Sequence, residues 1–137
     1  LGVLAGDECL RRVGQAIRSS VSRASDAAAR FGGEEFVVVA PETDTAGALA
    51  LAENIRQAVE RLAIPHDGNS AAPHVTASLG VVTRYVSELG TPEALVDLAD
   101  KALYRAKQAG RNRTEVMRRP EGEISKGPGL VQLVWND

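Results

Sequence analysis

The sequence predicts a single α/β domain in which helices flank a mixed, partly antiparallel sheet. Helical and strand patterns alternate along the 137 residues, which indicates helices packed on a sheet. Gly32-Gly33 lies between two strand-like runs and indicates an antiparallel hairpin within that sheet. Hydrophobic residues make up 44% of the chain and charged residues 25%, which is typical of one soluble domain with an ordinary core.

The first helix is predicted from about Gly6 to Ser19. Leu10, Val13 and Ile17 recur there at spacings of three and four, which places them on one helical face. Residues 1–6 read as a loop before this helix.

Two strands follow the first helix. A short strand candidate runs from Ala24 to Phe31, and a valine-rich strand runs from Glu34 to Ala40. Pro41 is predicted to end the second strand, because proline lacks the N–H group that a ladder needs.

A second helix is predicted to begin after Thr43 or Asp44, either of which provides a capping oxygen. Its apolar stripe consists of Leu51, Ile55, Val59 and Leu62. The β-branched run from Val75 to Thr83 then predicts a third strand.

The last predicted helix starts at Thr91-Pro92-Glu93, which combines a capping hydroxyl, a proline in the first turn and an acid. Gly110 is predicted to end it, and Val116-Met117 to form a last short strand. No regular structure is assigned from Arg119 onward, although Leu130–Trp135 is apolar enough to dock somewhere.

Charge and composition exclude several classes of protein. A net charge of −2 disfavours a general binder of polymeric nucleic acid. The single cysteine, Cys9, has no partner for an internal disulfide, and no apolar run is long enough to insert into a membrane. We therefore expect a cytoplasmic protein.

The stretch Arg30–Phe36 carries the clearest chemical signal. Two glycines let phosphates approach the backbone, and two carboxylates follow at once, predicted to lie on a strand and face opposite ways. Carboxylates beside a phosphate site suit Mg²⁺. A hairpin turn with two solvated acids is the alternative interpretation.

Four motifs in order resemble those of the GGDEF domain family of diguanylate cyclases. They are Gly6-Asp7-Glu8 with Leu10, the heptapeptide Arg30–Phe36, Thr76-Ala77-Ser78-Leu79-Gly80, and Ala99–Lys107 followed by Gly110-Arg111-Asn112. The resemblance covers roughly Leu1 to Met117. It implies a GGDEF domain at residues 1–118 with a palm-like, nucleotidyl-cyclase fold, and leaves 119–137 as a tail of unknown structure.

The resemblance also implies an activity. Each domain would bind one GTP, and two facing domains, a homodimer, would condense two GTP into cyclic di-GMP and two pyrophosphates, with Mg²⁺ or Mn²⁺ as cofactor. Glu34 matches the metal-binding acid, and Glu35 a neighbouring catalytic acid near the attacking hydroxyl. Gly32 and Gly33 would pass close to the phosphates.

The remaining substrate residues come from both ends of the chain. Asp7 matches a guanine-recognising residue, and Lys107 and Arg111 match a phosphate-binding pair. Each also has an ordinary structural interpretation, because acids near the start of a helix and cations near its end are stabilising in any protein.

The resemblance also implies a second, inhibitory site for cyclic di-GMP, formed by Arg23 and Asp26. Asp26 lies six residues before Gly32. A surface ion pair is the alternative. Some relatives add an arginine from the next helix; the nearest match by spacing here is Asn54, so we expect that contact to be missing or to come from Arg56 or another chain.

The family's first strand, with a metal-binding aspartate, should precede Leu1. We therefore expect a domain truncated at its N-terminus, impaired in catalysis, with exposed apolar surface or a rearrangement. The alternative functions are a non-catalytic cyclic di-GMP receptor and a GTP-binding regulatory domain. An upstream sensory or receiver domain is expected in the full protein.

Overall fold

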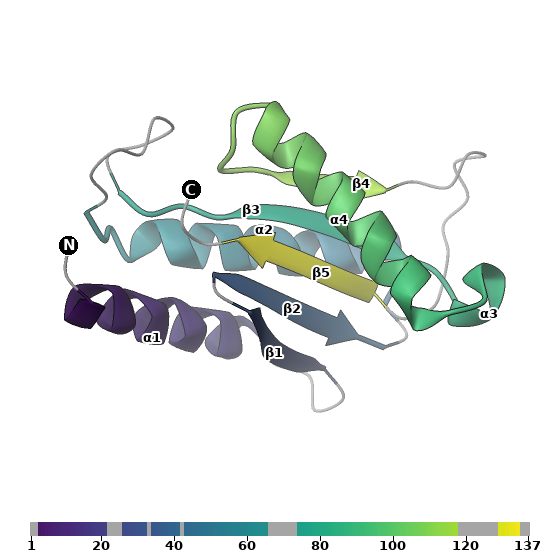
Figure 1. Ribbon diagram of the computed structural model, residues 1–137, viewed down its shortest axis with the longest axis horizontal. Coiled ribbons are helices and arrows are strands. Elements are labelled where there is room, and N and C mark those ends of the chain that lie inside the picture. Colours follow the sequence, from purple (N-terminus) through teal and green to yellow (C-terminus); the bar gives the residue numbers. More distant parts are fainter. Residues whose placement is uncertain are drawn as a thin grey trace.

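One five-stranded sheet with helices on both faces forms the domain (Figure 1). The computed structural model describes residues 3–21, 26–32, 34–41, 43–65, 74–117 and 129–134. The elements are α1 (Val3–Ser20), β1 (Ala27–Gly32), β2 (Glu35–Ala40), α2 (Thr45–Arg61), β3 (Ser78–Thr83), α3 (Val86–Leu89), α4 (Pro92–Gln108), β4 (Thr114–Met117) and β5 (Gly129–Val134). The predicted mixed α/β fold is confirmed.

The sheet has the strand order β1-β2-β5-β3-β4, so the last strand of the sequence lies in the middle. β1 and β2 form the predicted antiparallel hairpin, with an irregularity between Arg30 and Gly32. β5 is antiparallel to both β2 and β3, and only β3 and β4 are parallel. Because β5 separates β2 from β3, two otherwise independent strand pairs become one sheet.

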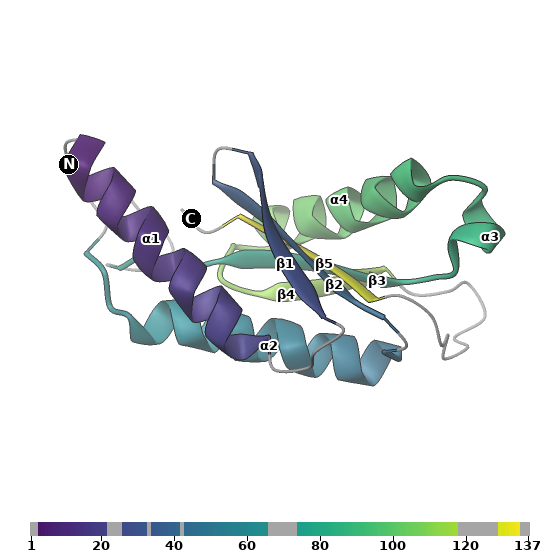
Figure 2. The same cartoon turned by 90° about the horizontal axis from the view of Figure 1, so that it is seen from below.

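Helices cover the two faces of the sheet unequally. α1 and α2 lie on one face and α4 on the other (Figure 2). The larger core unites α1, α2 and alternate residues of the sheet, among them Ile17, Val38, Ile55 and Leu79. A smaller core joins Val37 and Val82 to α4. Successive β2 residues thus serve opposite faces, as strand geometry requires.

The predicted helix ends are confirmed where the sequence offered caps. The Asp44 side chain accepts a hydrogen bond from the Gly47 amide at 2.8 Å, and Thr91 accepts one from the Ala94 amide at 3.3 Å. Gly110 follows the last helical turn with a φ of +126°, a left-handed conformation that glycine adopts without steric cost.

Three sequence-based expectations need correction. α1 begins at Val3, so the expected loop over residues 1–6 is helical from its third residue. β3 begins at Ser78 rather than at Val75. The segment after Arg119, to which no regular structure was assigned, contributes β5. A six-residue apolar strand gives no local sign of its partners, because strand pairing depends on residues distant in sequence.

None of the described helices is both long enough and apolar enough to span a membrane.

Candidate functional site

The hairpin between β1 and β2 carries the two predicted acids. Glu34 lies in the turn and is exposed, whereas Glu35 is the first residue of β2 and is half-buried. Gly32 ends β1 opposite Glu35, and Gly33 lies outside the described residues. The prediction that both acids lie on a strand is therefore wrong for Glu34. Alternation along β2 places Glu35 on the face that α4 covers.

The first helix packs beside the start of β2. Leu10 of α1 and Phe36, the residue after Glu35, line the same pocket. Cys9 of α1 is buried, and burial is the main cause that raises the pKa of its thiol. Asp7, two residues before Cys9, is exposed on the same helix. Its carboxylate is therefore accessible to a ligand at the hairpin end of the helix.

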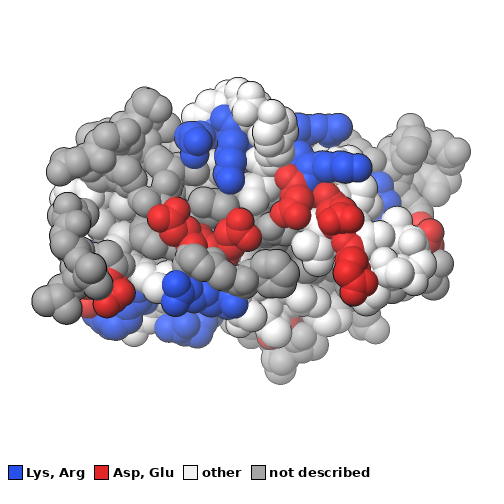
Figure 3. Space-filling view, in the orientation of Figure 1, with Lys and Arg blue, Asp and Glu red and all other residues white. Residues whose placement is uncertain are grey.

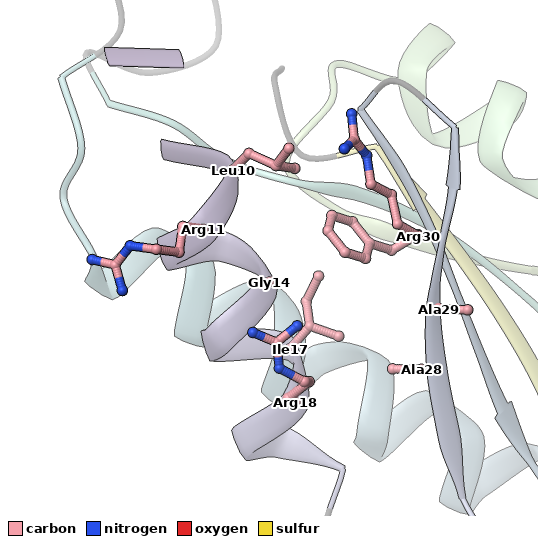
Figure 4. A pocket seen from close by; sticks show the side chains of 9 residues that line it. Leu10, Arg11, Gly14, Ile17, Arg18, Ala28, Ala29 and Arg30 are labelled. Atoms are coloured by element: carbon pink, nitrogen blue, oxygen red, sulfur yellow. The ribbon is translucent and has the colours of Figure 1, made fainter. Parts of the chain in front are cut away.

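A pocket of about 200 Å³ lies between α1, β1 and the start of β2 (Figure 4). Leu10, Ile17 and Phe36 provide apolar walls, while Arg18 from α1 and Arg30 from β1 border it with cationic groups. A pocket with apolar walls and guanidinium groups suits a flat aromatic ligand that carries negative charge.

The basic end of α4 brings Lys107 and Arg111 together. Lys107 lies in the last turn of the helix, and Arg111 follows three residues after Gln108. The Arg111 amide donates to the Ala106 carbonyl at 3.0 Å, which folds the chain back over the helix end. Both side chains are half-buried.

Strand register places this basic end and the acidic hairpin at the same end of the sheet. Val134 of β5 pairs with Glu35 on one side and Ser78 on the other. The next residue of β3, Leu79, pairs with Thr114, which follows Arg111 by three residues. Neighbouring strands are about 4.8 Å apart, so β2 and β4 lie about 14 Å apart across the sheet. The amino-terminal end of α1 lies at this same end (Figure 1).

Charges of both signs lie on the face of the molecule seen in Figure 3. Acidic side chains gather near the middle of the face shown in Figure 3, with basic side chains on either side of them. Such a surface suits a ligand that needs both a cation-binding carboxylate and cationic partners for phosphate.

The metal prediction fits the residues present. Glu34 is an exposed carboxylate in a glycine-containing turn, and Mg²⁺ sites typically take one or two carboxylates together with phosphate oxygens and water. In the described part of the chain no cluster of three or more histidine, cysteine or carboxylate side chains forms a ready-made metal site. A metal at Glu34 would therefore depend on ligand phosphates for part of its coordination.

The predicted inhibitory site is only partly described. Arg23 lies outside the described residues, so its side chain has no structural account. Asp26 is half-buried just before β1, and its Oδ1 atom is enclosed without a hydrogen-bond partner in the structure as described. An enclosed carboxylate oxygen of this kind is costly unless a ligand or neighbour completes it.

Arg56 is not available to Asp26. Arg56 is bonded to Glu53 and to Asn112, which leads into β4, whereas Asp26 leads into β1. β1 and β4 are the two opposite edges of the sheet. The structure therefore contradicts the expectation that Arg56 supplies the missing contact.

Sequence reasoning did not identify the side chains that hold the turn after α4. Glu53, Arg56 and Glu60 of α2 bind Asn112 and Thr114. Their spacing of three and four along α2 is the signal that one face of that helix carries a polar cluster, but the sequence gives no indication of its partners.

Comparisons with known proteins identify relatives that cover most of the chain. Residues 1–113 match the family described as "Diguanylate cyclase, GGDEF domain". The chain is 46% identical over 112 residues to Diguanylate cyclase A of Treponema denticola, which covers 82% of this chain and 29% of that protein. It is 44% identical over 107 residues to the response regulator PleD of Caulobacter vibrioides, covering 78% of this chain and 23% of the relative. Identity to Diguanylate cyclase DgcP of Pseudomonas aeruginosa is 42% over 115 residues, covering 84% of the chain and 16% of that protein. The chain thus spans less than a third of each of these relatives.

Proposed function

Because the chain belongs to the GGDEF domain family, we propose that it is the GTP-binding and catalytic domain of a diguanylate cyclase. The observation that supports this proposal is that Glu35 and the turn that carries Arg111 lie at the same end of the sheet. In this proposal the acid that holds the metal, Glu34, and the cation that binds phosphate, Arg111, act on one nucleotide, although about eighty residues separate them in the sequence.

Each group has a distinct task in this proposal. Glu34 holds Mg²⁺ or Mn²⁺, and the metal, when bound, neutralises charge on the phosphates. Lys107 and Arg111 bind the triphosphate oxygens. Gly32 and Gly33 carry no Cβ atom that would keep phosphates away from the backbone.

Two other acids contact the guanine base and the attacking hydroxyl. Asp7 accepts hydrogen bonds from the N1 and N2 donors of guanine. The pocket beside α1 adjoins Leu10, one helical turn after Asp7, and provides apolar walls for the nucleotide. Glu35 lies next to the attacking 3′-hydroxyl.

The chemical step requires two domains. The 3′-oxygen of one GTP forms a bond to the α-phosphorus of the other, the bond to pyrophosphate breaks, and the hydroxyl proton leaves. A second, reciprocal step closes the ring and gives cyclic di-GMP. The catalytic form is therefore a pair of facing GGDEF domains, which we expect an upstream sensory or receiver domain in the cytoplasmic full-length protein to bring together.

We expect this chain by itself to turn over GTP slowly. The central strand of its sheet, β5, has the sequence Gly-Leu-Val-Gln-Leu-Val, which contains no acidic residue. If Glu34 and Glu35 are the acids that hold the metal, much of its coordination is left to phosphate and water.

A product-binding role is the second candidate function. The Oδ1 atom of Asp26 supports it, because this oxygen makes no hydrogen bond in the described part of the chain and a carboxylate oxygen accepts from the N–H donors of a guanine edge once the atoms that cover it move aside. In this role Arg23 would contact the O6 and N7 atoms of the same base. A domain that binds cyclic di-GMP without synthesis would be a receptor.

Calorimetric titrations distinguish these functions. Binding of GTP with Mg²⁺ that is lost in Glu34→Gln and Arg111→Ala supports the cyclase domain. Binding of cyclic di-GMP alone, lost in an Arg23→Ala/Asp26→Ala variant, supports the receptor. Rapid release of pyrophosphate from GTP by the purified chain would contradict its catalytic impairment.

A further inference from the structure

One face of α2 is joined to the turn that carries Arg111. Glu53, Arg56 and Glu60 project from that face at spacings of three and four residues. Their partners, Asn112 and Thr114, flank Arg113 directly after Arg111. The last turn of the basic segment is therefore held by a helix that carries none of the predicted substrate residues.

The hydrogen bonds are short and directional. The Arg56 Nη1 atom donates to Asn112 Oδ1 at 3.1 Å, and Asn112 Nδ2 donates to Glu60 Oε2 at 2.7 Å. Thr114 Oγ1 donates to Glu53 Oε2 at 2.8 Å. Asn112 thus uses both ends of its amide on α2, which fixes the orientation of that side chain.

The turn needs this support because its backbone is strained. Arg111 has a φ of 64° and Asn112 a φ of 45°, so two successive residues with a Cβ occupy the left-handed region. That conformation is unfavourable for arginine and only tolerated by asparagine. Tertiary contacts offset the cost, and the bonds from α2 to Asn112 and Thr114 are among them.

Arg56 is held in place by its own partner. Its Nε and Nη2 atoms donate to the two carboxylate oxygens of Glu53 at 2.9 and 3.0 Å, and its side chain is 18% exposed. This fork leaves Nη1 directed at Asn112. A lysine has one ammonium group and does not reproduce both contacts.

We propose that Arg56 is a positioning residue that acts through Asn112 to hold Arg111 in its phosphate-binding conformation. This inference rests on the proposed role of Arg111 in binding the triphosphate. Arg56 does not touch the nucleotide, so its effect on binding depends on the presence of Arg111.

Titration calorimetry with GTP and Mg²⁺ tests this dependence. Arg56→Ala and Arg56→Lys are each expected to weaken binding roughly tenfold, the order expected when one charge-assisted contact is lost. In an Arg111→Ala background, Arg56→Ala should weaken GTP binding by less than about a further twofold, because the effects of coupled residues do not add. Arg61→Ala, which removes an exposed cation from the same helix, is the matched control and should leave binding unchanged.

Amide hydrogen exchange provides a readout that needs no nucleotide. Arg56→Ala should speed exchange of the Arg111 amide, which is bonded to Ala106, while α2 and α4 keep their protection. Unchanged exchange, or an equal loss of GTP affinity with and without Arg111, overturns the positioning role. If Arg56→Ala speeds exchange of the Arg111 amide but the parent chain does not bind GTP, it is the proposed function of Arg111 that is overturned.

Discussion

Gly80 of β3 lies directly against the backbone of α4 at Leu103. A Cβ atom at Gly80 would overlap the Leu103 amide nitrogen and the Ala99 carbonyl oxygen, neither of which can move without shifting the helix. Glycine at this position therefore sets how closely α4 approaches the sheet. Lys107 lies in the last turn of the same helix, so this contact also helps to set the height of the basic end above the sheet.

Substitution of Gly80 by alanine is the first prediction. Gly80→Ala should lower the free energy of unfolding by about 3 kcal/mol, because the added methyl group overlaps backbone atoms that cannot repack. Urea denaturation followed by circular dichroism measures this loss. Stability equal to that of the parent would show that α4 can lift from β3 at little cost.

Gly14 provides a contrasting glycine for the second prediction. A Cβ there meets Arg18 at 3.4 Å and Phe36 at 3.6 Å, which are ordinary contacts, and alanine favours a helix over glycine by about 1 kcal/mol. Gly14→Ala should therefore keep or slightly raise stability while it narrows the pocket beside α1. We expect weaker GTP binding by calorimetry, and unchanged affinity would separate this pocket from the nucleotide site.

The third prediction concerns stability in acid. The hydrogen bond from Arg56 lowers the pKa of Glu53, so the charged form of Glu53 is favoured in the folded state. Its contribution to stability is complete above the pKa of the unfolded chain, about 4.3, and is lost as the pH falls through the lower folded pKa. Glu53→Gln should therefore reduce the slope of the free energy of unfolding against pH below about pH 4.5.

Denaturant unfolding at a series of pH values measures that slope. Asp97→Asn, at an exposed position on α4, is the matched control and should leave it nearly unchanged. An identical slope in the parent and in Glu53→Gln would contradict the contribution assigned to this ion pair.

The fourth prediction concerns the central strand. Val131 pairs with Val38 on β2 and Val81 on β3, so proline there removes a backbone donor from the middle of the sheet. Val131→Pro should lower the free energy of unfolding by 3 kcal/mol or more, on the order of the cost of an interior proline. Val131→Thr keeps the backbone N–H donor and a branched side chain, so this control should retain a cooperative unfolding transition. A Val131→Pro variant as stable as the parent would show that β5 is dispensable.

The sequence alone predicted the features that depend on neighbouring residues. The caps at Asp44 and Thr91, the left-handed end at Gly110 and the hairpin at Gly32 all arise from side chains and backbone torsions within a few positions. The four GGDEF motifs could be recognised for the same reason, because each is a short local pattern. The family match over residues 1–113 confirms the resemblance. The roles of Glu34 and Arg111 are predictions for the experiments above.

Only the tertiary structure decided what depends on distant pairing. It placed β5 between β2 and β3, brought the hairpin and the end of α4 to the same end of the sheet, and joined Arg56 to Asn112 across 56 positions of sequence. Hydrophobic periodicity states which face of an element is buried but not against which partner. Strand order and long-range hydrogen bonds depend on how the whole chain packs, so no local sequence pattern predicts them.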